Sequence, residues 1–583
     1  MQSRCPRSSD YLKRLRHLAR AAVTPTARQI EIRDAPQLDL LVTAPAGCGK
    51  TEALALRVRG LLDRGQVQAP KRVLVATFTN RSRDNIRERL AEHLSLAAMR
   101  RFVTVQNFHG LSARIFLAHS NVIGMTSDIR MPEADWVGDQ CRAKRLTFAQ
   151  SGIVQDLLRV AKQTPRTDDE VLEFLREAQN PSALSIELLR QEENLLTYDD
   201  LPRLAQLILR SDAVASLYRN HFAAVVVDEF QDLTPQQLQI IQRIGANRTT
   251  YAGDLAQGIY GFAGAAPEQV HKEVASEVSR EISFAESHRS SPAVLAVVNA
   301  LTPIVGGNRL TSAAPKSWPA GGVTGHRSFA DTADEAEWIL RFTRAVLHRA
   351  PRHRVAAISR TKPRRRFLDE VLANVTDTPW FRWDDPVLDS QAGQVLRSVL
   401  GRVAKPQFDA ADDRLNYLWS LTRGVDLQDP STREALTSGL GWLADLLAEG
   451  TSIAEIRKRI KIGDEGSLLD APGLHLLTGH VGKGQQFDWV FVIGMEDGTI
   501  PDFRANSDAT QREEARVLSV MLSRARHGVF MSNVKIVATA TGDLRRRDPS
   551  RFLSLFKNVE THLDGTGMVS WLNSADWVAL SNR

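Results

Sequence analysis

The sequence has few cysteines and no long apolar run. Only Cys5, Cys48 and Cys141 occur among the 583 residues, which is too few for a disulfide framework or a four-cysteine zinc site. Charged residues interrupt every apolar stretch before it reaches the roughly 20 residues that a membrane-spanning helix needs. These absences exclude a disulfide-rich secreted protein and give no support to a membrane role. We therefore expect a cytoplasmic protein, associated with the nucleoid if its source is bacterial.

Positive charge is in modest excess. The chain has 75 Lys and Arg against 68 Asp and Glu, a net charge of +7 and a pI of about 9.4. A positive surface attracts phosphate polymers and gains from counterion release, although a basic enzyme with a solvated surface would have the same composition. Residues 4–20 are rich in arginine but lack the apolar core of a secretory signal. We interpret them as a basic amphipathic leader helix rather than as a transit peptide.

Apolar runs and helical stretches alternate along the chain. Six runs rich in β-branched residues end in polar or glycine turns, at residues 38–43, 72–77, 223–227, 249–252, 355–358 and 488–495. Runs that are apolar on both faces are typical of parallel strands buried between helices, so doubly wound α/β domains are predicted. Segments 111–215 and 385–465 have helical periodicity without a strand signal and are predicted to be helical insertions. Glycine-rich loops at 306–307 and 319–322 are predicted to connect the two halves.

A strand, a loop of small residues and a helix start follow one another in residues 40–51, which is the arrangement of a phosphate-binding loop. Backbone N–H groups of such a loop and of the helix start surround phosphates. Lys50 is expected to reach the β- and γ-phosphates of ATP, and Thr51 to ligate Mg²⁺. The residues expected to bind the nucleotide here are Ala44, Pro45, Ala46, Gly47, Cys48, Gly49, Lys50 and Thr51.

Two carboxylates follow a later apolar strand directly. The run at 223–227 ends in Asp228 and Glu229. A P-loop ATPase needs an aspartate at a strand end to hold Mg²⁺ and a further group to orient the attacking water. Asp228 is the expected metal ligand and Glu229 the expected catalytic carboxylate, so the two segments together predict ATP hydrolysis.

These segments belong to a longer ordered set that resembles the UvrD, PcrA and Rep group of superfamily 1 DNA helicases. Gln29 resembles the adenine-reading glutamine of the Q motif, and residues 228–232 resemble motif II. The remaining resemblances are to motif Ia (77–80), motif Ib (107–110), a segment preceding motif II (196–201), motif III (253–265), motif IV (287–290), motif V (477–484) and motif VI (513–525). The matches occur in the family's order over nearly the whole chain.

The resemblance implies an α/β fold of two RecA-like P-loop NTPase domains with parallel sheets, each carrying a mainly helical insertion. It also implies ATP and Mg²⁺ as cofactors, a nucleotide pocket between the two domains, and 3′-to-5′ movement on single-stranded DNA. The expected parts are domain 1A (1–110 and 196–285), insertion 1B (111–195), domain 2A (286–375 and 471–583) and a reduced insertion 2B (376–470).

The family's functional residues are expected at matching positions. Gln257 would sense the γ-phosphate, and Arg289 and Arg524 would contact it as positive groups. His288 and Gln486 lie at nucleotide-binding positions where the family has an aromatic residue and a glutamate. The expected nucleic-acid contacts are Phe78, Asn80, Phe108, His109, Tyr260, Phe262, Thr478 and His480. Aromatic rings can stack on any base, although core packing is the favoured role for each ring taken singly. Phe262 is the ring for which stacking is most expected.

Several departures from the family concern coupling rather than hydrolysis. Ala263 stands where motif III has an arginine, and Ser519 where motif VI has a tyrosine. The reduced second insertion, with exposed-looking aromatic residues, suggests weak unwinding without a protein partner. The main hypothesis is an ATP-dependent DNA helicase and translocase that binds single strands and single/double-strand junctions. The alternative is a DNA-stimulated ATPase switch that regulates a partner enzyme without unwinding.

Two smaller questions stay open from the sequence. The basic run 362–366 would suit a phosphate-contacting patch or a solvated loop equally. Cys48 lies in the phosphate loop at a helix start, where a thiol pKa is lowered, but a small residue that fills a tight loop is the simpler interpretation.

Overall fold

The computed structural model describes residues 24–131, 136–383, 385, 387–388, 390–411, 413–422, 430–448, 450–462, 471–481, 483–538, 543–559 and 565–582. The basic leader predicted at residues 4–20 lies outside them. The chain divides into two compact units, Met1–Ala285 and Glu286–Arg583. Both glycine-rich loops, at 306–307 and 319–322, lie inside the second unit, so the prediction that they connect the two halves is wrong.

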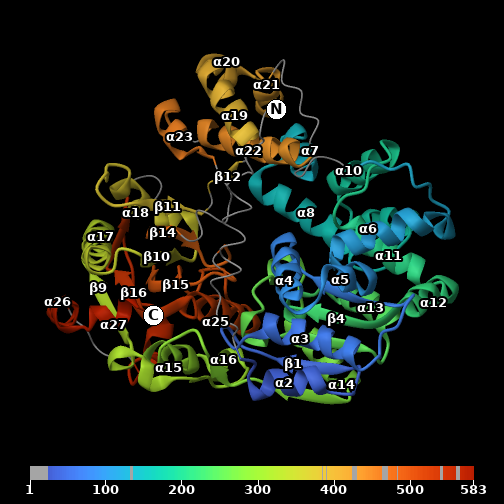
Figure 1. Cartoon of the computed structure of the whole chain (residues 1–583). Helices are drawn as coiled ribbons and strands as arrows, with labels where there is room; N and C mark the ends of the chain where they lie inside the picture. The colour runs from blue at the N-terminus through green and yellow to red at the C-terminus, as the bar shows by residue number, and fades with distance from the viewer. Residues whose placement is uncertain are drawn as a thin grey trace, which may run out of the picture. The chain divides into compact units, whose positions relative to one another are not determined.

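The first unit is built on a parallel sheet of six strands (Figure 1). Its strands are β1 (Leu40–Thr43), β2 (Arg72–Thr77), β3 (Val103–Asn107), β4 (Phe222–Asp228), β5 (Thr249–Gly253) and β6 (Arg280–Ser283). They lie in the order β3-β2-β4-β5-β1-β6, and Val42 of β1, which lies between β5 and β6, pairs with Ala252 and Ile282. Four of the strands were predicted; β3 and β6 were not, because each has polar residues on one face.

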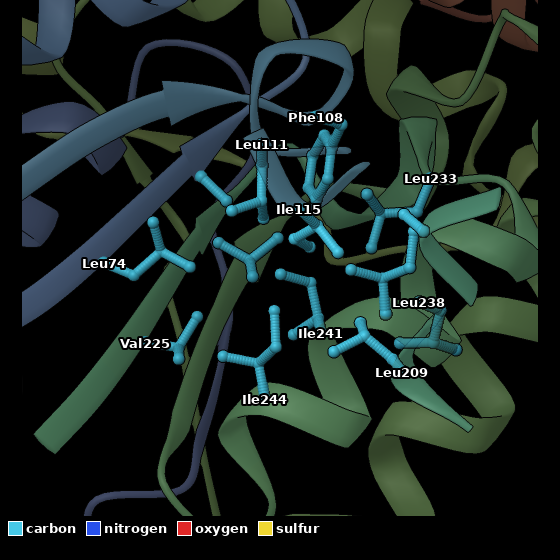
Figure 2. Close-up of a cluster of buried hydrophobic side chains, with 14 of the residues drawn as sticks. Leu74, Phe108, Leu111, Ile115, Leu209, Val225, Leu233, Leu238, Ile241 and Ile244 are labelled. Atoms are coloured by element: carbon cyan, nitrogen blue, oxygen red, sulfur yellow. The ribbon is translucent and has the colours of Figure 1, made fainter. Parts of the chain in front are cut away.

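Helices of the first unit connect these strands and supply its core. They are α2 (Ala27–Asp34), α3 (Lys50–Asp63), α4 (Asn80–His93), α5 (Leu96–Phe102), α6 (Phe108–His119), α11 (Asp200–Leu209), α12 (Asp212–His221), α13 (Pro235–Gly245) and α14 (Pro267–Glu277). Figure 2 shows side chains of β2, β4, α6, α11 and α13 packed together. Helix α6 therefore belongs to the sheet domain, and the predicted boundary at 110/111 falls inside it.

The first insertion has its own small core. Its helices are α7 (Trp136–Ala143), α8 (Phe148–Lys162), α9 (Asp168–Glu177) and α10 (Pro181–Glu192). Buried ion pairs join this insertion to α11: Lys162 lies 2.9 Å from Asp200, and Arg203 lies 2.8 Å from Asp200 and 2.6 Å from Asp168. Because several charges of both signs meet here, each buried ion retains a partner.

The second unit contains another parallel sheet of six strands. Its strands are β9 (Val323–Phe329), β10 (Arg354–Ser359), β11 (Trp380–Arg382), β14 (Gly473–Thr478), β15 (Phe487–Ile493) and β16 (Ala525–Val534), in the order β11-β14-β10-β15-β16-β9. Helices α15 (Pro292–Ala300), α16 (Thr302–Val305), α17 (Thr332–Arg349), α18 (Lys362–Leu372), α25 (Asp508–Leu522), α26 (Gly565–Ser574) and α27 (Trp577–Ser581) accompany it. Rings of Trp338, Phe342, Phe491 and Phe530 meet in its core.

The second insertion begins later than predicted. Strand β11 belongs to the sheet, so the predicted start at 376 is too early; a short parallel pair, β12 (Val387–Leu388) with β13 (Lys461–Ile462), brackets the insertion. Its helices are α19 (Ser390–Arg402), α20 (Lys405–Ala410), α21 (Arg414–Ser420), α22 (Pro430–Ala448) and α23 (Ile453–Arg459). Phe408 is buried among them, and Trp419 and Trp442 pack partly buried on the same cluster. The expectation of exposed aromatic residues is wrong for these three.

The basic run 362–366 begins helix α18. Arg364 is buried and ion-paired with Glu335 at 2.8 Å and with Glu496 at 2.9 Å. Arg365 is also buried. Both interpretations of this run, phosphate patch and solvated loop, are therefore wrong for these two arginines. Within the part of the chain that the structure describes, no helix has the length and apolar character to cross a membrane.

Candidate functional site

The phosphate-binding loop lies between β1 and α3. Gly47 and Gly49 have φ values of 84° and 83°, a left-handed backbone that favours glycine. Gly49 is the N-cap of α3 and provides no side-chain cap, so the first N–H groups of the helix remain available to a phosphate. Cys48 has an exposed fraction of 0%, which supports its role as a small packing residue.

Lys50 meets both strand-end carboxylates. Its Nζ lies 3.1 Å from Oδ1 of Asp228 and 2.5 Å from Oε1 of Glu229. Burial alone would lower the pKa of Lys50, but attraction by the two carboxylates raises it, so the ammonium stays charged. Burial, together with repulsion from Glu229, raises the pKa of Asp228. One cation facing two carboxylates leaves excess negative charge, which is the setting that suits a divalent cation.

A hydrogen-bond relay joins the two motifs that follow β4 and β5. Gln231 donates from Nε2 to Oε2 of Glu229 at 2.5 Å and accepts from the backbone N–H of Asp254 at 3.0 Å. Asp254 in turn accepts from Nε2 of Gln257 at 2.8 Å. Neither Gln231 nor Asp254 was predicted as a site residue. Their sequence signal is that Asp254 directly follows the buried strand β5 and that Gln231 lies in the segment resembling motif II.

The backbone is constrained at two residues of this hydrogen-bond relay. Glu229 has φ 59° and ψ 52°, a left-handed conformation that a residue with a side chain adopts at a cost. Gly253, at the end of β5, faces Gln231 so closely that a Cβ there would lie 2.2 Å from its Oε1. Glycine at 253 therefore allows the relay to form.

Gln29 reaches the phosphate loop from helix α2. Its side chain completes a capping box with Thr26, accepting from the Thr26 N–H at 2.9 Å, and its Nε2 donates to the carbonyl of Gly49 at 3.1 Å. The structure thus places the residue predicted to read adenine beside the loop predicted to bind phosphate.

In the second unit, the segment resembling motif IV is bonded to the start of β16. Ser290 donates to the carbonyl of Ala525 at 2.7 Å, and the N–H of Ser291 donates to the carbonyl of Arg526 at 2.8 Å. These bonds bring the neighbouring Arg289 and Arg524 into one region of the unit. His288 is exposed, and Arg289 and Gln486 are half-buried.

The guanidinium of Arg524 is held inside its own unit. It is 1% exposed and donates to the carbonyl of Val520 at 2.8 Å and to Oγ of Ser523 at 3.1 Å. Use of Arg524 on a phosphate requires a change in these bonds. Thr478, at the end of β14, and His480 are half-buried, and His480 lies 3.5 Å from Arg360.

The predicted nucleic-acid contacts in the first unit have different outcomes. Phe78 and Tyr260 are half-buried and stack with ring centroids 5.1 Å apart. Phe108 is 1% exposed and points into the core shown in Figure 2, so its prediction as a base-stacking ring is wrong. The side chains of Asn80 and Phe262 lie outside the described part of the structure.

A further aromatic residue was missed. Tyr198 is 54% exposed and packs edge-on against His109, with ring centroids 5.6 Å apart. Burial lowers the pKa of His109, so a neutral imidazole is favoured near pH 7. The sequence signal for Tyr198 is its place in segment 196–201, which resembles a family segment that precedes motif II; the structure adds that its ring is exposed.

A second group of possible metal ligands lies in the other unit. One ligand atom from each of His353, Asp488 and His527 lies within 4.8 Å of the others. However, Nδ1 of His353 accepts from the indole of Trp489 at 3.0 Å, and Asp488 accepts from Arg526 at 3.1 Å. These partners fit a structural polar cluster better than a metal site.

Comparison with known proteins agrees with this geometry. The family model for the UvrD/REP helicase N-terminal domain matches residues 26–276, and that for the UvrD-like helicase C-terminal domain matches residues 413–535. The chain is 27% identical over 571 residues to ATP-dependent DNA helicase UvrD2 of Mycobacterium tuberculosis, covering 89% of this chain and 80% of the relative. It is 23% identical to Rep of Escherichia coli, covering 88% and 91%, and 23% identical to PcrA of Leuconostoc citreum, covering 90% and 84%. With two RecA-like domains and these matches in both units, the chain belongs to the UvrD-like helicase family.

Proposed function

We propose that this protein is an ATP-dependent DNA helicase and translocase that moves 3′-to-5′ on single-stranded DNA. The observation that carries the proposal is the cluster of Lys50, Asp228 and Glu229, with Gln231 bonded to Glu229. The relatives' names, ATP-dependent DNA helicases UvrD2, Rep and PcrA, support the assignment of substrate.

In this proposal each group has a separate task. Lys50 neutralises charge on the β- and γ-phosphates, and Glu229 orients the attacking water. Thr51 and Asp228 would hold Mg²⁺, which would neutralise charge that develops on the phosphates. Gln257 senses the γ-phosphate through the relay that ends at Glu229. Arg289 and Arg524 are the proposed positive groups of the second unit.

The parallel sheet of the first unit supports coupling between ATP hydrolysis and the binding of single-stranded DNA. The phosphate loop follows β1, Phe78 follows β2, Asp228 ends β4, and Asp254 follows β5. Because neighbouring strands of this sheet are parallel, these segments follow strand ends at the same edge. We assign Phe78, His109, Tyr198 and Tyr260 to single-strand binding by stacking.

ATP hydrolysis with and without single-stranded DNA, followed by strand displacement on 3′-tailed and 5′-tailed duplexes, tests the proposal. Stimulated hydrolysis with displacement of the 3′-tailed duplex alone is the expected result. Displacement from the 5′ tail would contradict the direction, and hydrolysis indifferent to DNA would contradict coupling.

The alternative is a DNA-stimulated ATPase switch that regulates a partner enzyme. The second insertion favours it, because its residues Phe408, Trp419 and Trp442 pack on the insertion's own core rather than forming an exposed aromatic face. Separately from the switch, we propose that the reduced second insertion leaves the purified helicase weak and that a protein partner activates unwinding. Rapid, processive unwinding of long duplexes by the chain alone would contradict this.

A further inference from the structure

A buried arginine links the helix that carries Gln29 to the helix that begins at the phosphate loop. Arg57 lies on α3, about two helical turns after Lys50, and its exposed fraction is 0%. Its Nη1 donates to the carbonyls of Ala35 at 2.6 Å and Ile32 at 3.3 Å, and its Nη2 donates to the carbonyl of Gln37. Arg57 thus holds the end of α2 and the chain just beyond it.

These contacts satisfy groups that a helix end leaves without internal partners. The last carbonyls of a helix need donors from elsewhere, and a positive charge near them is favoured by the helix dipole. Nε of Arg57 donates to Oγ1 of Thr250 at 3.3 Å, so β5 fixes the side chain from the other direction. Burial lowers the pKa of Arg57 to about 9, so the guanidinium remains charged at pH 7.

Arg64, the C-cap residue of the same helix, contacts the same segment. Arg64 donates from Nη2 to the carbonyl of Ala35 at 3.0 Å and from Nη1 to the carbonyl of Arg33. The two helices approach closely, because a Cβ at Gly60 of α3 would lie 2.0 Å from the carbonyl oxygen of Arg33. Helix α2 is therefore anchored at its C-terminal end by α3.

The other end of α2 carries Gln29. This short helix is bonded to the phosphate loop through Gln29 and Gly49 at 3.1 Å and to α3 through Arg57. A side-chain amide pairs with adenine by accepting from N6 and donating to N7, whereas guanine presents acceptors at both positions. The position of the Gln29 amide relative to the phosphates therefore decides whether adenine is favoured.

We propose that Arg57 is a positioning residue for nucleotide-base selection, which fixes α2 so that Gln29 favours adenine over guanine. The inference rests on the proposed use of ATP. Phosphate binding uses the loop backbone and Lys50, neither of which distinguishes bases. Loss of Arg57 should therefore reduce the preference for ATP over GTP and leave the affinity for the triphosphate group nearly unchanged.

The test compares dissociation constants for MgATP, MgGTP and magnesium tripolyphosphate on the full chain. Arg57→Met should reduce the ATP-to-GTP preference at least about tenfold, the effect of about 1.4 kcal/mol, with less than a threefold change for tripolyphosphate. Arg57→Lys should fall between the wild type and Arg57→Met. Gln29→Ala is the positive control for loss of base selection.

Arg59→Met is the matched control, because Arg59 lies on the same helix but pairs with Asp63 at 2.7 Å and makes no bond to α2 in the described structure. It should keep the wild-type preference. Arg64→Met, which also removes a donor to the carbonyl of Ala35, should shift the preference in the same direction, and it serves if Arg57→Met does not fold.

Different results would overturn the proposed function and this inference. A wild type that does not bind MgATP would overturn the proposed function and this inference together. A wild type that prefers ATP, with an unchanged preference in folded Arg57→Met, or in Arg57→Lys and Arg64→Met, would overturn the inference alone. Equal weakening of tripolyphosphate and ATP would also overturn it, since Arg57 would then support the phosphate loop generally.

Discussion

The side-chain amide of Gln231 donates a 2.5 Å hydrogen bond to the carboxylate of Glu229. Its carbonyl oxygen accepts from the backbone of Asp254, so the amide has little freedom to rotate. A carboxylate that must orient a water needs its second oxygen fixed, and Gln231 provides that restraint.

Replacement of Gln231 by methionine should therefore lower turnover more than binding. Hydrogen bonds to charged groups contribute about 1.5–3 kcal/mol, so we expect kcat to fall roughly tenfold to a hundredfold. The dissociation constant for ATP should change less than about threefold. Single-turnover hydrolysis with separate binding measurements checks this, and a pure rise in KM would assign Gln231 to nucleotide binding instead.

The two charged residues of the site should separate binding from chemistry. Lys50→Ala removes a phosphate contact, so ATP affinity should fall together with hydrolysis. Glu229→Gln keeps the proposed metal ligand Asp228 and should bind ATP without turning it over. Equilibrium binding and hydrolysis assays on both variants measure the difference, and near-normal turnover by Glu229→Gln would refute its catalytic role.

Aromatic residues of the first unit should divide into two classes. Phe78→Ala should weaken single-strand binding by about 1–3 kcal/mol, because its half-buried ring stacks only with Tyr260 among the ring pairs of the described structure. Phe108→Ala should instead destabilise the unit by about 3–5 kcal/mol, because its ring lies in the core. Fluorescence anisotropy and thermal unfolding distinguish the two; a folded Phe108→Ala variant with a selective binding defect would contradict this division.

Acid should weaken the junction between α11 and the first insertion. Burial would raise the pKa of Asp200, but Lys162, Arg190 and Arg203 lower it; the pKa of Asp168 is lowered in the same way by Arg190 and Arg203. Their stabilisation is present above the unfolded carboxylate pKa of about 4 and is lost as the pH falls toward the folded-state pKa.

We expect Asp200→Asn to lower the free energy of unfolding by about 3–5 kcal/mol at pH 7 and to flatten its dependence on pH below 4. Asp156→Asn is the control, because Asp156 forms an exposed pair with Arg159, worth about 1 kcal/mol or less. Urea unfolding at several pH values measures both. Equal effects of the two substitutions would show that the buried network contributes no more to the free energy of unfolding than an exposed ion pair does.

Cys48 should behave as a packing residue. Its thiol is fully buried, so an alkylating reagent should inactivate the folded ATPase slowly, and Cys48→Ala should retain hydrolysis within about threefold. Rapid inactivation that bound ATP prevents, and that Cys48→Ser abolishes, would instead establish a reactive thiol.

Local chain order made the phosphate site predictable from sequence. The loop that carries Lys50 follows β1 and Asp228 ends β4 of the same parallel sheet, so the topology brings the two residues to one edge. The burial of Phe108 was not predictable in this way, because it depends on how α6 packs against α11 and α13. The partners of Arg364, Glu335 and Glu496, lie far from it in the sequence, so a basic run resembled a surface feature.

The left-handed backbone of Glu229 is the cost of keeping a carboxylate at this position. A residue with a side chain in that conformation costs about 1–3 kcal/mol, and glycine would relieve most of it. Glu229→Gly and Glu229→Ala both lose the contacts with Lys50 and Gln231, but only glycine relieves the backbone. Glu229→Gly should therefore melt at a higher temperature than Glu229→Ala, although neither variant should hydrolyse ATP.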